Sequence, residues 1–175
     1  MELTDGSIVL RAPTGDDVGA IHAACQDPEI PRWIPVIPQP YTEESARAFV
    51  AWSRDRWEAG DCSFVIVDAG TGELLGAIGM GVNARLKIGH IGYWVAAPAR
   101  RRGVASGALR LVAAWAFAER GLARAELLTD PDNVASQGVA EKVGFQREGI
   151  LRSHLEHRDG RRRDSVLFSL LPGDL

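Results

Sequence analysis

The pattern of residues 87–130 predicts a strand, a long helix and a second strand, and this order constrains the fold more than any other feature of the chain. β-Branched and aromatic residues in 87–97 predict the first strand, and 124–130 predicts the second. Apolar residues at positions i, i+4, i+7, i+11 and i+14 predict the helix, and they are Val104, Ala108, Leu111, Trp115 and Ala118. A helix that joins two neighbouring strands in this way makes them parallel and packs across them.

The other segments predict a sheet that is antiparallel apart from this pair. Hydrophobic runs between turn residues predict strands, and helical spacing of apolar residues predicts helices. In chain order, they suggest a strand at 7–13, helices at 14–27 and 42–60, a strand pair over 62–82, a helix at 133–144, and strands at 145–157 and 161–171. The expected class is α/β (α+β), with a mixed, mostly antiparallel sheet of about seven strands and about four helices. Because no repeat or linker interrupts the chain, residues 1–175 are expected to form one domain.

Prolines at positions 28, 31, 35, 38 and 40 fall between the first two predicted helices. Proline interrupts helices and central strands, so the segment is expected to be a long ordered loop. Such loops are often functional. In the helix after the loop, Trp52 and Trp57 are expected to lie in the core.

The composition argues against several classes of partner and several kinds of site. Hydrophobic residues make up 46% of the chain and the net charge is −3, which favours a packed core and argues against a dedicated nucleic-acid binder. Cys25 and Cys62 have neither pair spacing nor nearby histidines, so neither a disulfide framework nor a metal site is expected. No apolar run is long enough to cross a membrane and the first residues lack a signal pattern, so a cytoplasmic location is expected.

Three arginines, Arg100, Arg101 and Arg102, precede Gly103 and the predicted helix. A helix N-terminus carries unpaired N–H groups and partial positive charge, which together bind phosphate. Gly103 would let the backbone approach such a ligand closely. The alternative is an ordinary solvated run of charges at a helix start. The spacing fits neither a Walker-type phosphate loop nor a dinucleotide fingerprint.

A second segment, Asn133 to Phe145, follows the next predicted strand. Arg100-x-x-Gly103-x-Ala105 together with "NVASQGVAEKVGF" resembles the GNAT superfamily of N-acetyltransferases. The segments "LRAPTGDD", "LLGAIGM", "IGYWV" and "DGRRRDSVLFSLL" are similar to the RimJ/RimL-like branch, which acetylates N-terminal amines of ribosomal proteins. The resemblance covers most of the chain and implies the GNAT fold, in which the central parallel strands splay apart.

The resemblance also implies acetyl-CoA as co-substrate and assigns residues to it. The pyrophosphate would lie on the turn at Arg100 and on the backbone N–H groups that follow, and the pantetheine arm would pair with the preceding strand. The residues implied for cofactor binding are Val95, Ala97, Arg100, Arg101, Arg102, Gly103, Val104, Ala105, Ser106, Asn133 and Ser136. For Asn133, a plain helix N-cap is an equal and compatible interpretation. In this fold the proline-rich loop forms the acceptor wall, which makes Trp33 and Tyr41 candidates for substrate binding.

Three residues are candidates for proton transfer. His90 occupies the place where many family members carry a glutamate, and Glu156 lies where the related branch often places a carboxylate. The alternative for each is an ordinary, partly exposed surface residue. Many members have a tyrosine acid at the position of Ala140, and since this chain lacks it, Ser136 is the available hydroxyl.

The expected reaction is acetyl transfer to a primary amine by direct attack in a ternary complex. An α-amine of pKa about 7.8 is roughly 10–15% neutral at pH 7, whereas a lysine-like amine is about 0.04% neutral, so an N-terminal α-amine needs less help from a base. A small-molecule amine is the alternative acceptor. A regulatory CoA-binding module without chemistry, and nucleic-acid binding through the arginines, are alternatives from other classes. By analogy, the chain could form a homodimer.

Overall fold

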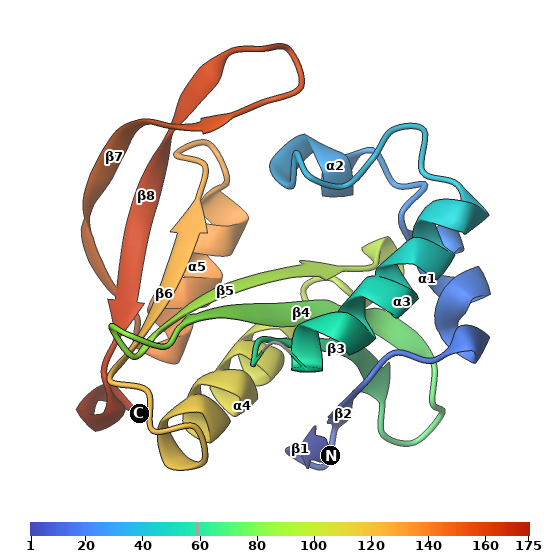
Figure 1. Ribbon diagram of the computed structural model, residues 1–175, viewed down its shortest axis with the longest axis horizontal. Helices are drawn as coiled ribbons and strands as arrows, with labels where there is room; N and C mark the ends of the chain where they lie inside the picture. Colours follow the sequence, from blue (N-terminus) through green and yellow to red (C-terminus); the bar gives the residue numbers. More distant parts are fainter. Residues whose placement is uncertain (59) are drawn as a thin grey trace.

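Eight strands form one sheet in the computed structural model, which describes residues 1–58 and 60–175. Their order across the sheet is β1-β2-β3-β4-β5-β6-β8-β7 (Figure 1). In chain order, the strands are Glu2–Thr4, Ile8–Arg11, Cys62–Asp68, Leu74–Asn83, Ile88–Val95, Arg124–Thr129, Gln146–Glu156 and Arg162–Leu170.

The parallel pair predicted from the sequence is present. β5 and β6 run side by side from Ile88↔Arg124 to Ile91↔Leu127, and α4 (Val104–Ala118) connects them. All the other strand pairs are antiparallel. The expected class, a mixed and mostly antiparallel sheet with one parallel pair, is therefore confirmed.

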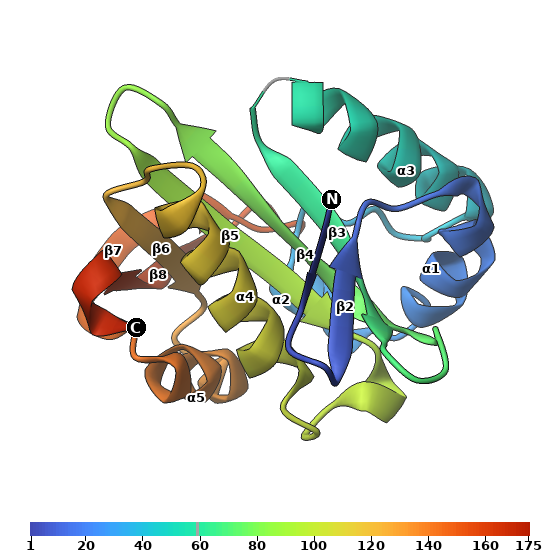
Figure 2. The same cartoon turned by 90° about the horizontal axis from the view of Figure 1, so that it is seen from below.

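Helices cover both faces of the sheet. α4 and α5 (Val134–Val143) lie on one face, and α1 (Val18–Ala24) and α3 (Glu43–Glu58) lie on the other, over the N-terminal strands (Figure 2). Alternation along β3 supplies both cores. Phe64 and Ile66 join the cluster that includes α4, whereas Val65 and Val67 join the cluster beneath α1 and α3.

The two tryptophans of α3 have different environments. Trp57 packs edge-on against Phe64 with ring centroids 5.0 Å apart, and its Nε1–H donates to the Ser63 carbonyl at 3.0 Å. Trp52, which was also expected in the core, is 51% exposed. Five helical residues correspond to a rotation of about 140°, so the two side chains cannot share one buried face.

The proline-rich segment contains a short helix, α2 (Glu29–Trp33), where only a loop was expected. Pro28 is its N-cap and Pro31 lies in its first turn. Peptide nitrogens in the first turn have no partner within the helix, so proline costs no hydrogen bond there. The prediction that prolines exclude a helix was therefore wrong for this turn.

The described residues form eight strands and five α-helices, against the expected numbers of about seven and about four. The extra helix is α2, and the extra strand is β1, a three-residue strand that pairs with β2. β1 is too short to show a hydrophobic period. Within the described residues, no helix is both long and apolar enough to cross a membrane.

Gly76 is required where β4 passes the end of β5. A Cβ at Gly76 would lie 2.3 Å from the Trp94 carbonyl oxygen and 3.1 Å from Val95 Cα, and both are backbone atoms. We predict that Gly76→Ala lowers the free energy of unfolding by about 2 kcal/mol or more, because the strands must move apart to admit the methyl group. Denaturant unfolding measures this change.

Gly92 on β5 is the matched control, since a Cβ there has no neighbour within 4 Å. Gly92→Ala should keep or slightly raise stability, because alanine restricts the unfolded chain. Equal stability of the two variants would contradict the close approach at Gly76.

Candidate functional site

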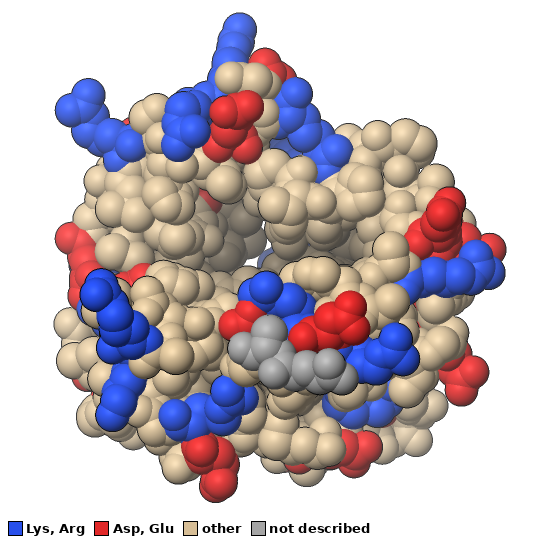
Figure 3. Space-filling model, in the orientation of Figure 1, with Lys and Arg blue, Asp and Glu red and all other residues tan. Residues whose placement is uncertain are grey.

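The parallel strands separate halfway along their length. Pairing between β5 and β6 ends at Ile91↔Leu127. Beyond that point β5 stays paired with β4 as far as Val95↔Gly76, and β6 stays paired with β8 as far as Thr129↔Val166. The divergence opens a cleft of about 1560 Å³, visible as a hollow in the space-filling view (Figure 3).

The turn before α4 presents backbone N–H groups to this cleft. Arg101 and Gly103 both have left-handed backbones, with φ of 62° and 83°. The first hydrogen bond of the helix runs from Gly107 N–H to the Gly103 carbonyl at 2.9 Å. The N–H groups of Val104, Ala105 and Ser106 therefore have no helical acceptor, and they add to the positive end of the helix dipole. A Cβ built on Gly103 meets no atom within 4 Å, so the space over the turn is open to a ligand.

The arginine side chains at this turn have partners inside the protein. Arg100 donates from Nε to the Val95 carbonyl at 3.1 Å and pairs through Nη2 with Asp27 at 2.5 Å. Arg102 lies 3.7 Å from Asp68, away from the cleft, whereas Arg101 lines it. An anion at this turn would therefore meet mainly backbone N–H groups. Among the described residues, Arg101 is the one of the three arginines without an ion pair.

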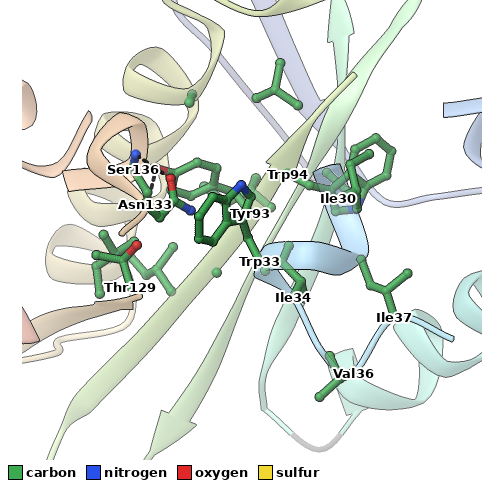
Figure 4. Close-up of a pocket in the computed structure, with 18 of the residues that line it drawn as sticks. Ile30, Trp33, Ile34, Val36, Ile37, Tyr93, Trp94, Thr129, Asn133 and Ser136 are labelled. Atoms are coloured by element: carbon green, nitrogen blue, oxygen red, sulfur yellow. Dashed lines mark hydrogen bonds between the residues drawn. The ribbon is translucent and has the colours of Figure 1, made fainter. Parts of the chain in front are cut away.

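Two hydroxyl groups meet where the strands diverge (Figure 4). The Tyr93 hydroxyl on β5 lies 3.0 Å from the Ser136 hydroxyl on α5, and either can donate. Burial raises the pKa of Tyr93, so its hydroxyl stays protonated at neutral pH. Asn133 caps α5, since its Oδ1 accepts the Ser136 N–H at 3.1 Å. The cap and the hydroxyl pair fix Ser136 at the cleft wall.

The structure brings most of the predicted site residues together. The residues that line the cleft are Trp33, Tyr41, Val95, Arg100, Arg101, Gly103, Val104, Ala105, Ser106, Asn133 and Ser136. Ala97 and Arg102 do not line it. Ala97 lies in a 3-10 turn beyond the end of β5.

Two of the three candidates for proton transfer lie elsewhere. His90 is on the part of β5 that is still paired with β6, and its Nδ1 is 3.1 Å from Glu126. The Glu156 side chain is 65% exposed and is 3.8 Å from Arg162. Neither residue lines the cleft, so the geometry supports neither as a base. Sequence position alone could not show this, because the direction of a strand side chain depends on the register.

Two further walls line the cleft. One wall is α2 with the segment that follows it, which contributes Ile30, Trp33, Ile34, Val36 and Ile37 (Figure 4). The other is the β7–β8 hairpin, with His154, Leu155, His157, Asp164 and Ser165.

Sequence reasoning missed the hairpin histidines and Tyr93. A register shift between Leu151 and Leu155, together with Ser153 at φ 51°, turns His154 so that its Nδ1 lies 3.0 Å from the buried Ser165 hydroxyl. A bulge of this kind has no sequence signature here. For Tyr93, the motif "IGYWV" was the available signal, but it does not say which ring faces Ser136.

Known proteins match this architecture. The family model for the acetyltransferase (GNAT) domain matches residues 7–146. The probable N-acetyltransferase YjcK of Bacillus subtilis is 31% identical over 137 residues, which cover 77% of this chain and 76% of that protein. Mycobacterium smegmatis RimJ in complex with CoA-disulfide superposes with a TM-score of 0.87 at 26% identity, covering 100% of this chain and 88% of that one. RimL, a ribosomal L7/L12 α-N-protein acetyltransferase in complex with coenzyme A, has a TM-score of 0.84 at 23% identity, covering 94% of each chain.

The chain therefore belongs to the GNAT acetyltransferase family. It is an acyl-CoA-dependent N-acetyltransferase whose co-substrate is acetyl-CoA. The residues present fit that co-substrate, because open space lies over Gly103 and the adjacent N–H groups at the start of α4 can receive phosphate oxygens.

Gly103→Val tests the phosphate site. We predict that it weakens CoA binding by more than about a hundredfold, because a β-branched residue disfavours the left-handed turn and its side chain fills the open space. Isothermal titration with CoA measures the affinity.

Gly121 is a matched control, because its φ is 60°, a Cβ placed there meets no atom within 4 Å, and it does not line the cleft. Gly121→Val should cost similar stability and leave CoA affinity unchanged. Normal CoA affinity in Gly103→Val would refute the backbone site.

Proposed function

We propose that the enzyme acetylates the N-terminal α-amine of a peptide or protein, by direct attack in a ternary complex. The observation that carries this proposal is the apolar character of the α2 wall, where Trp33, Ile34 and Ile37 line an open cleft. An apolar wall would not stabilise a polyamine, whose several charges lose hydration on binding. A peptide needs only one amine at the thioester and can extend out of the cleft. RimL, which shares the fold, acts on a protein α-amine as its name states.

The residues at the strand separation suit acyl transfer. Bound acetyl-CoA supplies an activated thioester. Because Val95 turns its carbonyl toward Arg100 and Ala96 donates to Leu75 on β4, strand alternation turns the peptide groups of Tyr93 and Val95 away from β4. Their N–H groups would bind the pantetheine arm and polarise the carbonyl. The Tyr93–Ser136 hydroxyl pair would protonate the departing thiolate.

Direct attack is favoured over transfer through an acetylated cysteine. Cys25 and Cys62 are 4% and 3% exposed, and burial raises the thiol pKa values to about 11 and about 12. Protonated thiols are poor nucleophiles. Hence the acceptor amine itself attacks the acetyl group in the proposed mechanism.

Acetyl-CoA turnover, followed as thiol release, tests the acceptor class. We expect kcat/KM at pH 7 for a peptide with a free N-terminus to exceed that for an Nα-acetylated peptide containing lysine by about two orders of magnitude, matching the ratio of neutral amine fractions. The rate with the α-amine should rise with pH and level off above its pKa, near 8. Faster turnover of spermidine or of the lysine peptide would overturn the proposed acceptor.

Ser136→Ala tests the acid. We predict a fall in kcat of less than about a hundredfold, because a thiolate leaves readily and the Tyr93 hydroxyl remains. Tyr93→Phe should have a similar effect. A loss of more than about ten-thousandfold in Ser136→Ala, with CoA affinity intact, would show that the serine hydroxyl is indispensable.

A further inference from the structure

The wall built by Glu29–Pro38 leaves large apolar side chains uncovered inside the cleft. Val36 is 82% exposed, and Trp52 of α3, which lines the same cleft, is 51% exposed. Trp33, Ile34 and Ile37 are half-buried and also line the cleft. Exposed apolar side chains that gather in a concave site mark a binding surface. This surface is continuous with the Tyr93–Ser136 site, so its occupant lies beside the reacting amine (Figure 4).

The charges beside Trp33 and beside Trp52 are paired. Glu29 and Arg32 form an ion pair at 3.1 Å, and the Arg32 guanidinium also stacks over the Trp33 ring at 4.5 Å from its centroid. Arg56 pairs with Asp61 and lies over the Trp52 ring, 5.3 Å from its centroid. With these charges paired, the wall offers little to a charged side chain, and its apolar area favours an apolar one.

An ion pair connects this wall to the turn before α4, which contains Arg100. Asp27 Oδ2 holds Arg100 at 2.5 Å, and Asp27 Oδ1 accepts the Glu29 N–H at 3.0 Å at the start of α2. The same arginine binds the Val95 carbonyl at the end of β5. The Arg100 side chain thus connects the end of β5, where the thioester would lie, with the first turn of α2. Arg100 and Asp27 are 73 residues apart in sequence.

We propose that Glu29–Pro38 is the subsite for the first side chain of the acceptor peptide and selects a large apolar residue, and that the Asp27–Arg100 ion pair holds this subsite beside the thioester. The proposal rests on the proposed peptide acceptor. Arg100 then acts as a positioning residue, and its guanidinium contributes little to phosphate binding.

Tetrapeptide amides that differ only in their first residue test the selectivity. We expect kcat/KM for leucine or phenylalanine at this position to exceed that for serine or aspartate by about tenfold or more, mainly through KM, because a partly buried apolar side chain gains roughly this much. Trp33→Ala should bring the ratio close to one without changing CoA affinity. Leu86→Ala, which truncates a 52% exposed leucine outside the cleft, should keep the wild-type ratio.

Variants of the Asp27–Arg100 ion pair test the positioning role, and Arg102 on the same turn provides the control. Asp27→Asn and Arg100→Gln should each raise the peptide KM severalfold and reduce the apolar preference, and the double variant should be no worse than either single one. Arg102→Gln, which removes an arginine whose partner is Asp68, should leave the preference unchanged. CoA affinity in Arg100→Gln should stay within about threefold of wild type, whereas a phosphate ligand would lose more.

The outcomes separate this inference from the proposed function. Peptide turnover with equal or higher kcat/KM for serine or aspartate would overturn the apolar subsite and leave the α-amine acceptor standing. Turnover of phenethylamine but of no peptide would overturn the peptide acceptor, and with it the assignment of this subsite to a peptide side chain. A large loss of CoA affinity in Arg100→Gln, with unchanged peptide preference, would overturn the positioning role.

Discussion

The separation of β5 from β6 is the constraint on which the site depends. Both strands keep their outer partners, β4 and β8, beyond the last shared pair at Ile91↔Leu127. Backbone groups at the end of β5 that point toward β6 are thus left without a strand partner, which is costly unless a ligand or side chain satisfies them. Arg100 satisfies the Val95 carbonyl, and acetyl-CoA is expected to pair with others.

Local conformation then places each part of the site at this gap. Left-handed residues at Arg101 and Gly103 turn the chain into α4, whose N-terminal N–H groups face the cleft. Asn133 starts α5 and brings the Ser136 hydroxyl to Tyr93. The Asp27–Arg100 ion pair adds the α2 wall to the same assembly. The turn before α4, the hydroxyl pair and the α2 wall are therefore held at one gap by short contacts.

Much of this arrangement could be predicted from periodicity and short motifs. The strand–helix–strand unit and the cap at Asn133 follow from local rules that act within a few residues. What could not be predicted depends on contacts between distant segments. His90 fits a family position, yet it lies beside Glu126 on the part of β5 that is still paired with β6, and a bulge in β7 brings His154 to the cleft. Prolines suggested a loop, but at the first turn of α2 they are compatible with a helix.

Amide hydrogen exchange with and without CoA tests the central claim most directly. The account predicts that CoA slows exchange at Tyr93 and Val95, at the end of β5, and at Val104 to Ser106, while amides of the paired segment Ile88 to Ile91 change little. Protection at α4 without any change at Tyr93 and Val95 would contradict the claim that the separated strand holds the co-substrate.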